Sequence, residues 1–159
     1  QPLMAMDTDS PLPADPAVRL GTDADLPALV PACVAMFTEE VGYSPLESDG
    51  GWAYRARVMH LVQSGRSFVR TGSTGGRIAF KAEIGAVSRD VAQIQGVYVD
   101  PVWRGQGLAA PAMASVVALT RRHVVPTVSL YVNDYNHRAL AVYRKVGFTQ
   151  VGTFATVLF

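Results

Sequence analysis

A glycine-rich turn carries the clearest chemistry in this sequence. In "VYVDPVWRGQGLAAP", residues 97–111, a strand-like run stops at Pro101, and Arg104, Gly105 and Gly107 precede an alanine-rich helix. The first turn of a helix presents N–H groups without intrahelical partners and the positive end of the helix dipole. Glycines keep side chains away from those donors, and an arginine adds charge. The turn predicts a phosphate-binding site, although a connecting loop without a ligand has the same pattern.

Two other phosphate-binding patterns fit the turn less well. A P-loop needs a lysine and a serine or threonine directly after its glycines, and "GQGLAAP" has neither. A dinucleotide fingerprint could use Ala110 as its small third residue and Asp134 as its acid. However, a run of predicted strands precedes the turn, where that fold would have its first βαβ unit.

Metal and thiol chemistry are not expected. Cys33 lies at helical spacing among apolar residues and is interpreted as a buried structural thiol. His60, His123 and His137 are scattered and offer no metal-ligand spacing. A single cysteine cannot form an internal disulfide, so we expect a cytoplasmic protein.

Composition and charge limit the classes of partner. The chain has 159 residues, 49% of them hydrophobic, which suits one globular domain, and no apolar run of the ~20 residues that span a bilayer. Residues 1–49 hold nine acids and one arginine, whereas residues 50–159 hold four acids and thirteen Lys or Arg. The dispersed basic residues lack the aromatic interleaving of a nucleic-acid surface, so we expect neither a membrane nor a nucleic-acid partner.

Hydrophobic periodicity and turn residues predict the elements that position the turn. Strands are expected at 17–22, 67–72, 77–88, 91–99, 127–132 and 148–159. Helices are expected at 52–63, 108–123 and 136–146, and over the apolar residues from Leu26 to Val41, where Asp23 or Asp25 could cap the helix. The three central strands form a predicted antiparallel meander with turns at "STGG" and "RD". This order predicts an α/β domain with a mixed sheet.

The two ends of the chain carry separate expectations. Residues 1–16 hold four prolines and three aspartates, and we predict a flexible tail or linker before a domain at 17–159. Near the other end, either Gly152 and Thr153 form a two-residue hairpin turn, or another chain completes the last strand and the protein is a homodimer.

Two motifs resemble the signatures of the GCN5-related N-acetyltransferase family. The family's R/Q-x-x-G-x-G/A is matched by Arg104, Gly107 and Ala109, and its N-x-x-A-x-x-x-Y-x-x-x-G-F is matched by "NHRALAVYRKVGF" from Asn136 to Phe148. The resemblance covers residues 17–159. In addition, "MFTEEVGYSP" and the proline-rich start are similar to a bacterial subfamily in which another domain precedes this one.

The resemblance implies an α/β fold with a mixed central sheet, whose fourth and fifth strands splay apart, flanked by about four helices. It implies acetyl-CoA as cosubstrate and a primary amine on a small molecule or peptide as acceptor. A bulge at Gly96 suits the start of the splay. The implied coenzyme-binding residues are Val97, Tyr98, Val99, Arg104, Gly105, Gln106, Gly107, Leu108, Ala109 and Asn136.

Tyr143 occupies the family's position for the acid that protonates the departing thiolate. Core packing of Tyr143, and helix capping by Asn136, are the structural alternatives. The resemblance does not identify the general base that deprotonates the amine, because the predicted fourth strand contains no carboxylate. The candidates are Glu83, Glu39 or Glu40, and a water oriented by Gln93 or Gln95.

Residues 41–52, "VGYSPLESDGGW", are expected beside the acceptor, where Glu47 and Asp49 could attract a cationic amine. Besides an N-acetyltransferase, two classes stay open. A non-catalytic acyl-CoA sensing domain is favoured by the missing carboxylate, and a nucleic-acid binder by the basic second half.

Overall fold

The structure is a computed structural model that describes residues 1–73 and 76–159. Within these residues, seven strands form one mixed sheet in the order β2-β3-β4-β5-β6-β1-β7. The strands are β1 Pro2–Met6, β2 Arg19–Leu20, β3 Ser67–Thr71, β4 Ile78–Val87, β5 Val91–Val99, β6 Thr127–Tyr131 and β7 Thr149–Thr153. The turn expected at "STGG" includes residues 74–75, which lie outside the described part. The predicted α/β fold with a mixed sheet is confirmed.

Four α-helices and three short 3-10 helices complete the described elements. They are η1 Asp23–Asp25, α1 Leu26–Val41, η2 Asp49–Gly51, α2 Trp52–Gln63, η3 Pro101–Trp103, α3 Ala109–His123 and α4 His137–Val146. The residues group into unit 1, which is Gln1–Pro16, Gly85–Gln95 and Gly107–Phe159, and unit 2, which is Ala17–Ile84 and Gly96–Gln106. Strands β4 and β5 contribute residues to both units.

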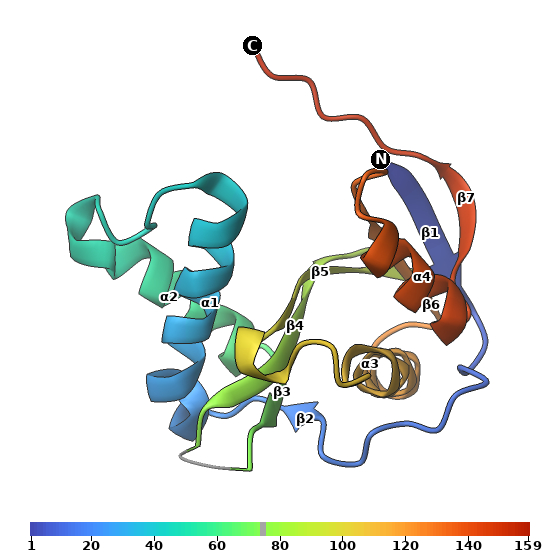
Figure 1. The fold of residues 1–159 in the computed structure, drawn as a ribbon, viewed down its shortest axis with the longest axis horizontal. Helices are drawn as coiled ribbons and strands as arrows, with labels where there is room; N and C mark the ends of the chain where they lie inside the picture. The colour runs from blue at the N-terminus through green and yellow to red at the C-terminus, as the bar shows by residue number, and fades with distance from the viewer. Residues whose placement is uncertain (74–75) are drawn as a thin grey trace. The chain divides into compact units, whose positions relative to one another are not determined.

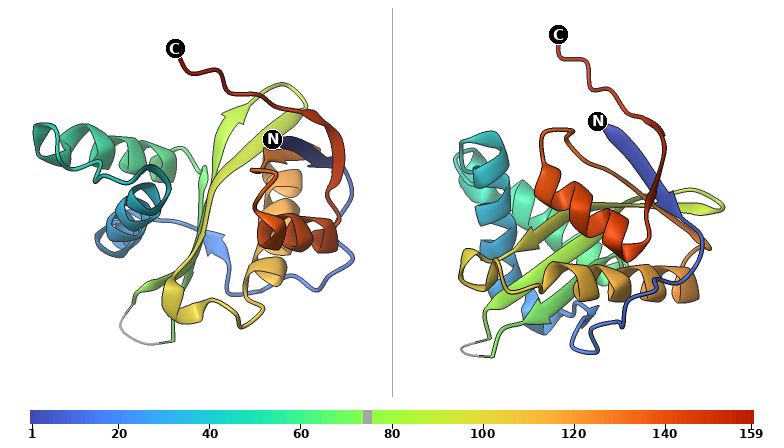
Figure 2. Two further views of the ribbon diagram at one scale, coloured as in Figure 1. Left: turned by 45° about the horizontal axis from the view of Figure 1, so that its top comes forward. Right: turned by 45° about the vertical axis from the view of Figure 1, so that its right-hand side comes forward.

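Unit 2 is built from two helices packed against short antiparallel strands. Helices α1 and α2 lie side by side, next to β3 and β4 (Figure 2). Their core consists of Leu29, Cys33, Val58, Val62, Val69 and Ile78. Cys33 is the buried structural thiol that its spacing predicts, and burial raises the pKa of that thiol.

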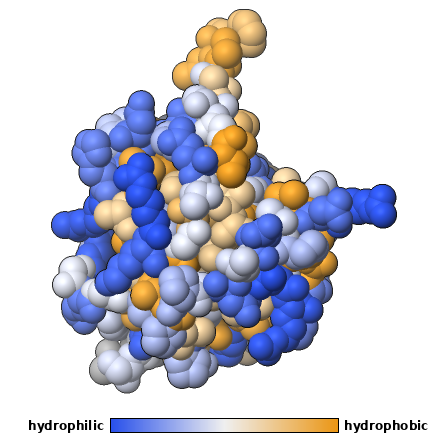
Figure 3. All heavy atoms as spheres, turned by 90° about the vertical axis from the view of Figure 1, so that its right-hand side faces the viewer, coloured by the Kyte–Doolittle hydropathy of each residue, from blue (hydrophilic) through white to orange (hydrophobic). Residues whose placement is uncertain are grey.

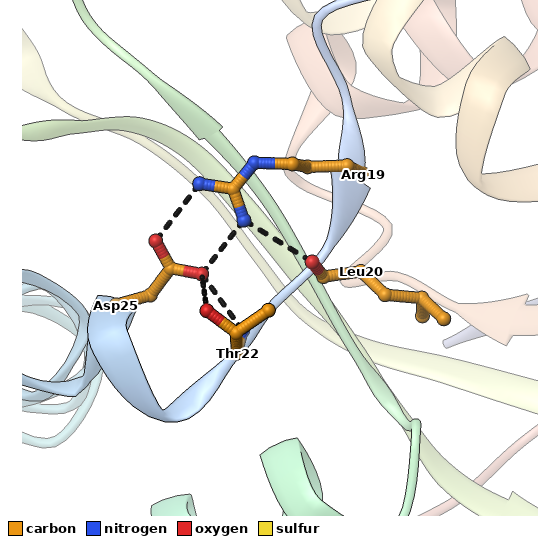
Figure 4. Close-up of polar contacts among 4 residues, drawn as sticks. All are labelled: Arg19, Leu20, Thr22 and Asp25. Atoms are coloured by element: carbon orange, nitrogen blue, oxygen red, sulfur yellow. Dashed lines mark hydrogen bonds and ion pairs between the residues drawn. The ribbon is translucent and has the colours of Figure 1, made fainter.

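A charged network fixes the start of the first helical segment of unit 2 (Figure 4). The Asp25 carboxylate accepts two hydrogen bonds from Arg19, at 2.7 and 2.9 Å, and one from the Thr22 N–H at 2.7 Å. Asp25 directly precedes α1, but its side chain does not cap that helix as predicted. It reaches back to the N–H of Thr22, as the third residue of the η1 capping box. Hydrogen bonding to Arg19 lowers the pKa of Asp25 to about 2.

Unit 1 places β1 between β6 and β7 and packs α3 against α4 (Figure 1). Both neighbours of β1 run antiparallel to it. The buried residues of this unit include Met4, Met6, Met113, Val117, Leu140, Val146 and Phe148. Strand β5 pairs with β6 in parallel, over residues 91–93 and 127–129.

Both ends of the chain differ from the expectations. In place of a flexible segment throughout residues 1–16, the structure has strand β1 at Pro2–Met6, where Met4 is 1% exposed. Gly152 and Thr153 make no hairpin turn but lie inside β7, which pairs with β1 of the same chain. Both differences have one physical cause. Strands β1 and β7 pair with each other, so residues from both ends of the chain belong to the sheet.

The chain leaves the sheet after Thr153, and its last residues project as an apolar segment (Figure 3). Leu158 is 90% exposed and Val157 is 68% exposed. Over the described ranges 1–73 and 76–159, none of the helices combines the length and apolar character needed to cross a membrane.

Candidate functional site

The glycine-rich loop starts from a well-anchored aspartate at the end of β5. Asp100 is 6% exposed, and its N–H donates to the Ala79 carbonyl at 3.0 Å. Its carboxylate accepts from the Val102 N–H at 3.0 Å and from the Arg77 guanidinium at 2.8 Å. Pro101 ends the strand and begins η3, as its missing N–H predicts. These contacts hold Asp100 in place at the point where the loop leaves the sheet.

The loop then presents a run of backbone donors. Gly105 and Gly107 have φ of +77° and +74°, and a Cβ added at either would meet no atom within 4 Å. These glycines are thus used for backbone conformation rather than for close packing. Among the described residues, none accepts a hydrogen bond from the N–H groups of residues 105–110. Such clustered donors at the start of a helix suit an anion.

Arg104 does not extend alone from the loop. Its guanidinium donates two hydrogen bonds to Glu39, near the end of α1, and its Nε donates to the Val99 carbonyl at 2.9 Å. The cation also lies 5.4 Å from the centroid of the Tyr98 ring. Hydrogen bonding to Glu39 raises the pKa of Arg104. An anion at the loop therefore has to compete with a carboxylate for this side chain.

The end of β5 carries the backbone groups expected near a thioester. Val97 and Val99 are half-buried and the Tyr98 side chain is buried, so burial raises the pKa of its phenol. Gly96 has φ of +61°, the left-handed conformation that a bulge of the glycine type requires. The ladder to β6 includes β5 only as far as Gln93. Strands β5 and β6, the fourth and fifth of the predicted order, thus share only a short ladder.

A buried lysine is the residue that sequence reasoning missed. Lys81 is 0% exposed in the middle of β4, and its Nζ donates to the Gly96 carbonyl at 2.7 Å. Glu83, the predicted base, lies two residues further on the same face, with Oε2 3.9 Å from that Nζ. In the sequence, this buried pair is indicated by two opposite charges at alternate positions of an otherwise apolar strand.

The second motif lies on α4 in unit 1. Asn136 caps the helix, since its Oδ1 accepts from the Ala139 N–H at 3.1 Å. The capping role is confirmed, and a coenzyme contact stays a prediction. Tyr143 is 8% exposed and its ring meets Phe148 edge-on, with centroids 6.0 Å apart. The packing role of Tyr143 is therefore real, and its acid role stays a prediction.

The predicted site residues thus divide between the two units. Unit 2 holds Glu83, the end of β5 and the loop as far as Gln106, while unit 1 holds Asn136, Tyr143 and residues 107–109. The alternative bases Glu39 and Glu40 lie on α1, where Glu39 is occupied by Arg104. In the part of the chain that the structure describes, no group of three or more His, Cys, Asp or Glu side chains is arranged to hold a metal ion.

Comparisons with solved structures give the same fold. An acetyltransferase of the GNAT family from Colwellia psychrerythraea superposes with a TM-score of 0.70 at 16% identity. The match covers 94% of this chain but 51% of that one, so the chain spans about half the length of this relative.

Two shorter relatives were solved with coenzyme-like ligands. AAC(6')-Iy, in complex with the bisubstrate analog CoA-S-monomethyl-acetylneamine, gives a TM-score of 0.68 at 18% identity, covering 89% of this chain and 96% of that chain. A predicted acetyltransferase from Clostridium acetobutylicum, solved with acetyl-CoA, gives 0.68 at 17% identity, covering 89% and 94%.

No protein of curated function matches the sequence significantly. The model of the acetyltransferase (GNAT) family, in contrast, matches residues 37–148, which include α2, the central strands, the glycine-rich loop and the whole second motif. This match covers more than half of the chain. With the fold and both motifs in place, the chain belongs to the acetyltransferase (GNAT) family.

Proposed function

We propose that this chain transfers an acetyl group from acetyl-CoA to a primary amine by direct attack in a ternary complex. The observation that carries the proposal is the run of N–H groups over residues 105–110, which lack acceptors among the described residues. A diphosphate has enough oxygen atoms to accept hydrogen bonds from several such N–H groups at the start of a helix. The positive φ values of Gly105 and Gly107 hold the loop open for it.

The backbone of β5 beyond Gln93 is the proposed track for the pantetheine arm and the thioester. Its ladder with β6 covers residues 91–93, which leaves the later residues of β5 outside that pairing. We assign the Val97 N–H to the thioester carbonyl, where it stabilises the developing oxyanion. Val99 contributes through its backbone N–H, because its carbonyl already accepts from Arg104.

The proposed reaction is a direct transfer without a covalent enzyme intermediate. The amine nitrogen attacks the carbonyl carbon, the C–S bond breaks, and its electron pair leaves on sulfur. The phenol of Tyr143 donates a proton to that sulfur and is reprotonated from solvent. The proton of the amine passes to Glu83, or to a water oriented by Gln93 or Gln95. The balance needs no further reactant.

The acceptor is proposed to approach the segment between α1 and α2. Tyr43 and Trp52 are 54% and 75% exposed there, and Glu47 is exposed. Asp49 is less available, because its carboxylate accepts from the N–H groups of Gly51 and Ala53. A cationic amine with an apolar body suits this combination. Either a small molecule or a peptide terminus meets that description.

Thermal unfolding with added ligands tests the first step. Acetyl-CoA and CoA should raise the melting temperature, whereas NAD and ATP at the same concentration should raise it less, because a ligand bound by the native state alone stabilises it. A thiol-release assay with a panel of amines then tests transfer. Stabilisation by NAD alone would overturn the assignment of the loop.

A non-catalytic acyl-CoA sensing domain is the second candidate. It is favoured by the position of Glu83, which is 9% exposed and paired with Lys81 rather than open to an amine. Such a domain would bind acetyl-CoA as tightly as an enzyme but release no CoA with any amine. Binding and release, measured on one preparation, therefore separate the two candidates.

A further inference from the structure

Lys81 is a buried cation whose ammonium group has one short contact to an oxygen atom of the described residues. Its Nζ lies 2.7 Å from the Gly96 carbonyl oxygen, 3.9 Å from Glu83 Oε2 and 3.4 Å from the Met36 sulfur. A lysine is rarely buried completely unless its charge is compensated. The distances make the Gly96 carbonyl its principal acceptor and Glu83 a longer-range counter-ion.

The Gly96 backbone is shaped for this contact. Its φ of +61° is accessible to glycine at little cost, and a Cβ added there would lie 2.9 Å from both Lys81 Nζ and Glu83 Oε1. A side chain at this position would therefore collide with the ion pair. The absence of a side chain serves both the conformation and the space for the ammonium group.

The Gly96 carbonyl and the Val97 N–H belong to one peptide group. The peptide bonds of the described residues are trans, so the C=O bond and the N–H bond of this peptide group point in opposite directions. With its carbonyl directed at Lys81, the peptide directs the Val97 N–H away from Lys81. A cation on the carbonyl oxygen also draws electron density from the amide, which strengthens its N–H as a donor.

We propose that Lys81 is a positioning residue that orients and polarises the Gly96–Val97 peptide, so that the Val97 N–H binds the thioester carbonyl of acetyl-CoA more strongly. The inference rests on the proposed function, since it needs a thioester at Val97. Lys81 touches neither substrate nor coenzyme in this scheme. It acts on the reaction through one peptide group, the one between Gly96 and Val97.

Isotope-edited infrared spectroscopy of bound acetyl-CoA, labelled with ¹³C at its carbonyl, tests this role directly. A stronger hydrogen bond lowers the carbonyl stretching frequency, so the wild-type protein should lower it on binding. In Lys81→Met this shift should be clearly smaller. Glu83→Gln is the matched neighbour, because it alters the same cluster but leaves the lysine on the carbonyl, and it should retain most of the shift.

Two further variants test whether the substitution acts by disturbing the fold. Lys81→Met leaves Glu83 buried without its cation, so the double variant Lys81→Met/Glu83→Gln restores neutrality and should behave spectroscopically like Lys81→Met. Lys145, the other lysine of the sequence, is exposed on α4, and Lys145→Met should resemble the wild type in every measurement. A backbone readout without coenzyme is the ¹⁵N shift of Val97, which should move upfield in both Lys81 variants but little in Glu83→Gln.

The outcomes separate the two proposals. With an accepted amine, Lys81→Met should lower kcat about tenfold at unchanged KM for acetyl-CoA, less than deletion of a whole oxyanion donor. If the wild type binds acetyl-CoA but the carbonyl shift is the same in both Lys81 variants, the role of Lys81 is overturned and the proposed function stands. If the wild type binds no acetyl-CoA, while the Val97 shift still depends on Lys81, the proposed function is overturned instead.

Discussion

Arg104 and Glu39 are joined by two hydrogen bonds, from Nη1 to Oε1 at 3.1 Å and from Nη2 to Oε2 at 2.9 Å. The arginine of the coenzyme-binding motif is thus already paired with a carboxylate. Both side chains are partly exposed, 36% for Arg104 and 54% for Glu39, so the pair contributes at most about 1 kcal/mol. An incoming diphosphate can therefore displace Glu39 at small cost.

Removal of this competitor should tighten coenzyme binding. In Glu39→Gln, Arg104 is released to the diphosphate, and the Kd for acetyl-CoA should fall by up to about fivefold, the factor that corresponds to about 1 kcal/mol. Isothermal titration calorimetry measures the change. Asp23→Asn removes the same charge at an exposed position of η1 and should leave the Kd within about twofold. Weaker binding by Glu39→Gln would show that the ion pair supports the loop rather than competing for it.

Replacement of Tyr143 by phenylalanine tests the proposed acid. The release of CoA with an accepted amine should slow by about 100-fold or more, because a positioned acid contributes that much, while acetyl-CoA affinity changes little. Stopped-flow detection of the free thiol gives the rate. Tyr135→Phe is the control, since Tyr135 is 75% exposed. A Tyr143→Phe protein with undiminished rates across neutral and alkaline pH would leave Tyr143 only its packing role against Phe148.

The Asp25 network should make the free energy of unfolding depend on pH in the acidic range. The pKa of Asp25 is lowered from 3.8 to about 2, mainly by its hydrogen bonds with Arg19. A carboxyl whose pKa is lower in the folded state stabilises the fold above its unfolded pKa, and this contribution is lost as the pH falls from about 4 towards 2. With Arg19 about half exposed, we expect a contribution of about 1 to 2 kcal/mol at neutral pH.

Urea unfolding of Asp25→Asn at several pH values measures that contribution. The variant should be less stable than the wild type at neutral pH, and the difference should shrink as the pH falls towards 2. Asp23→Asn, two residues before Asp25 in the same 3-10 helix, should show no such pH-dependent difference. A difference between Asp25→Asn and wild type that is constant with pH would mean that lost capping, not charge, explains it.

Strand β1 should be an integral part of the fold. Met4 is 1% exposed and sits in a strand paired on both sides, so Met4→Ala should lower the free energy of unfolding by about 2 to 4 kcal/mol. Denaturant titration followed by circular dichroism measures it. Leu3→Ala, on the opposite and more exposed face, should cost less. Equal stability of Met4→Ala and wild type would contradict the central position of β1.

Sequence patterns over a few neighbouring residues were enough to predict much of the fold. The bounds predicted for α2 and β5, 52–63 and 91–99, agree with the structure, because helix stops and period-2 alternation depend on neighbours in the chain. The same holds for the cap formed by Asn136 and for the strand end at Pro101. Each of these features is set by a few adjacent residues.

Distant partners decided the rest. The residues of β1 carry no strong sequence signal for a strand. The strand forms because β6 and β7, more than 120 residues later in the chain, pair with it on both sides. The direction of Arg104 depends on Glu39, and the contact of Lys81 with Gly96 depends on the register between two strands. The sequence by itself thus determined the family, the motifs and most element bounds, since local conformation follows from local residues. Only the tertiary structure decided which charges meet, because an ion pair or a ladder forms where folding brings distant segments of the chain together.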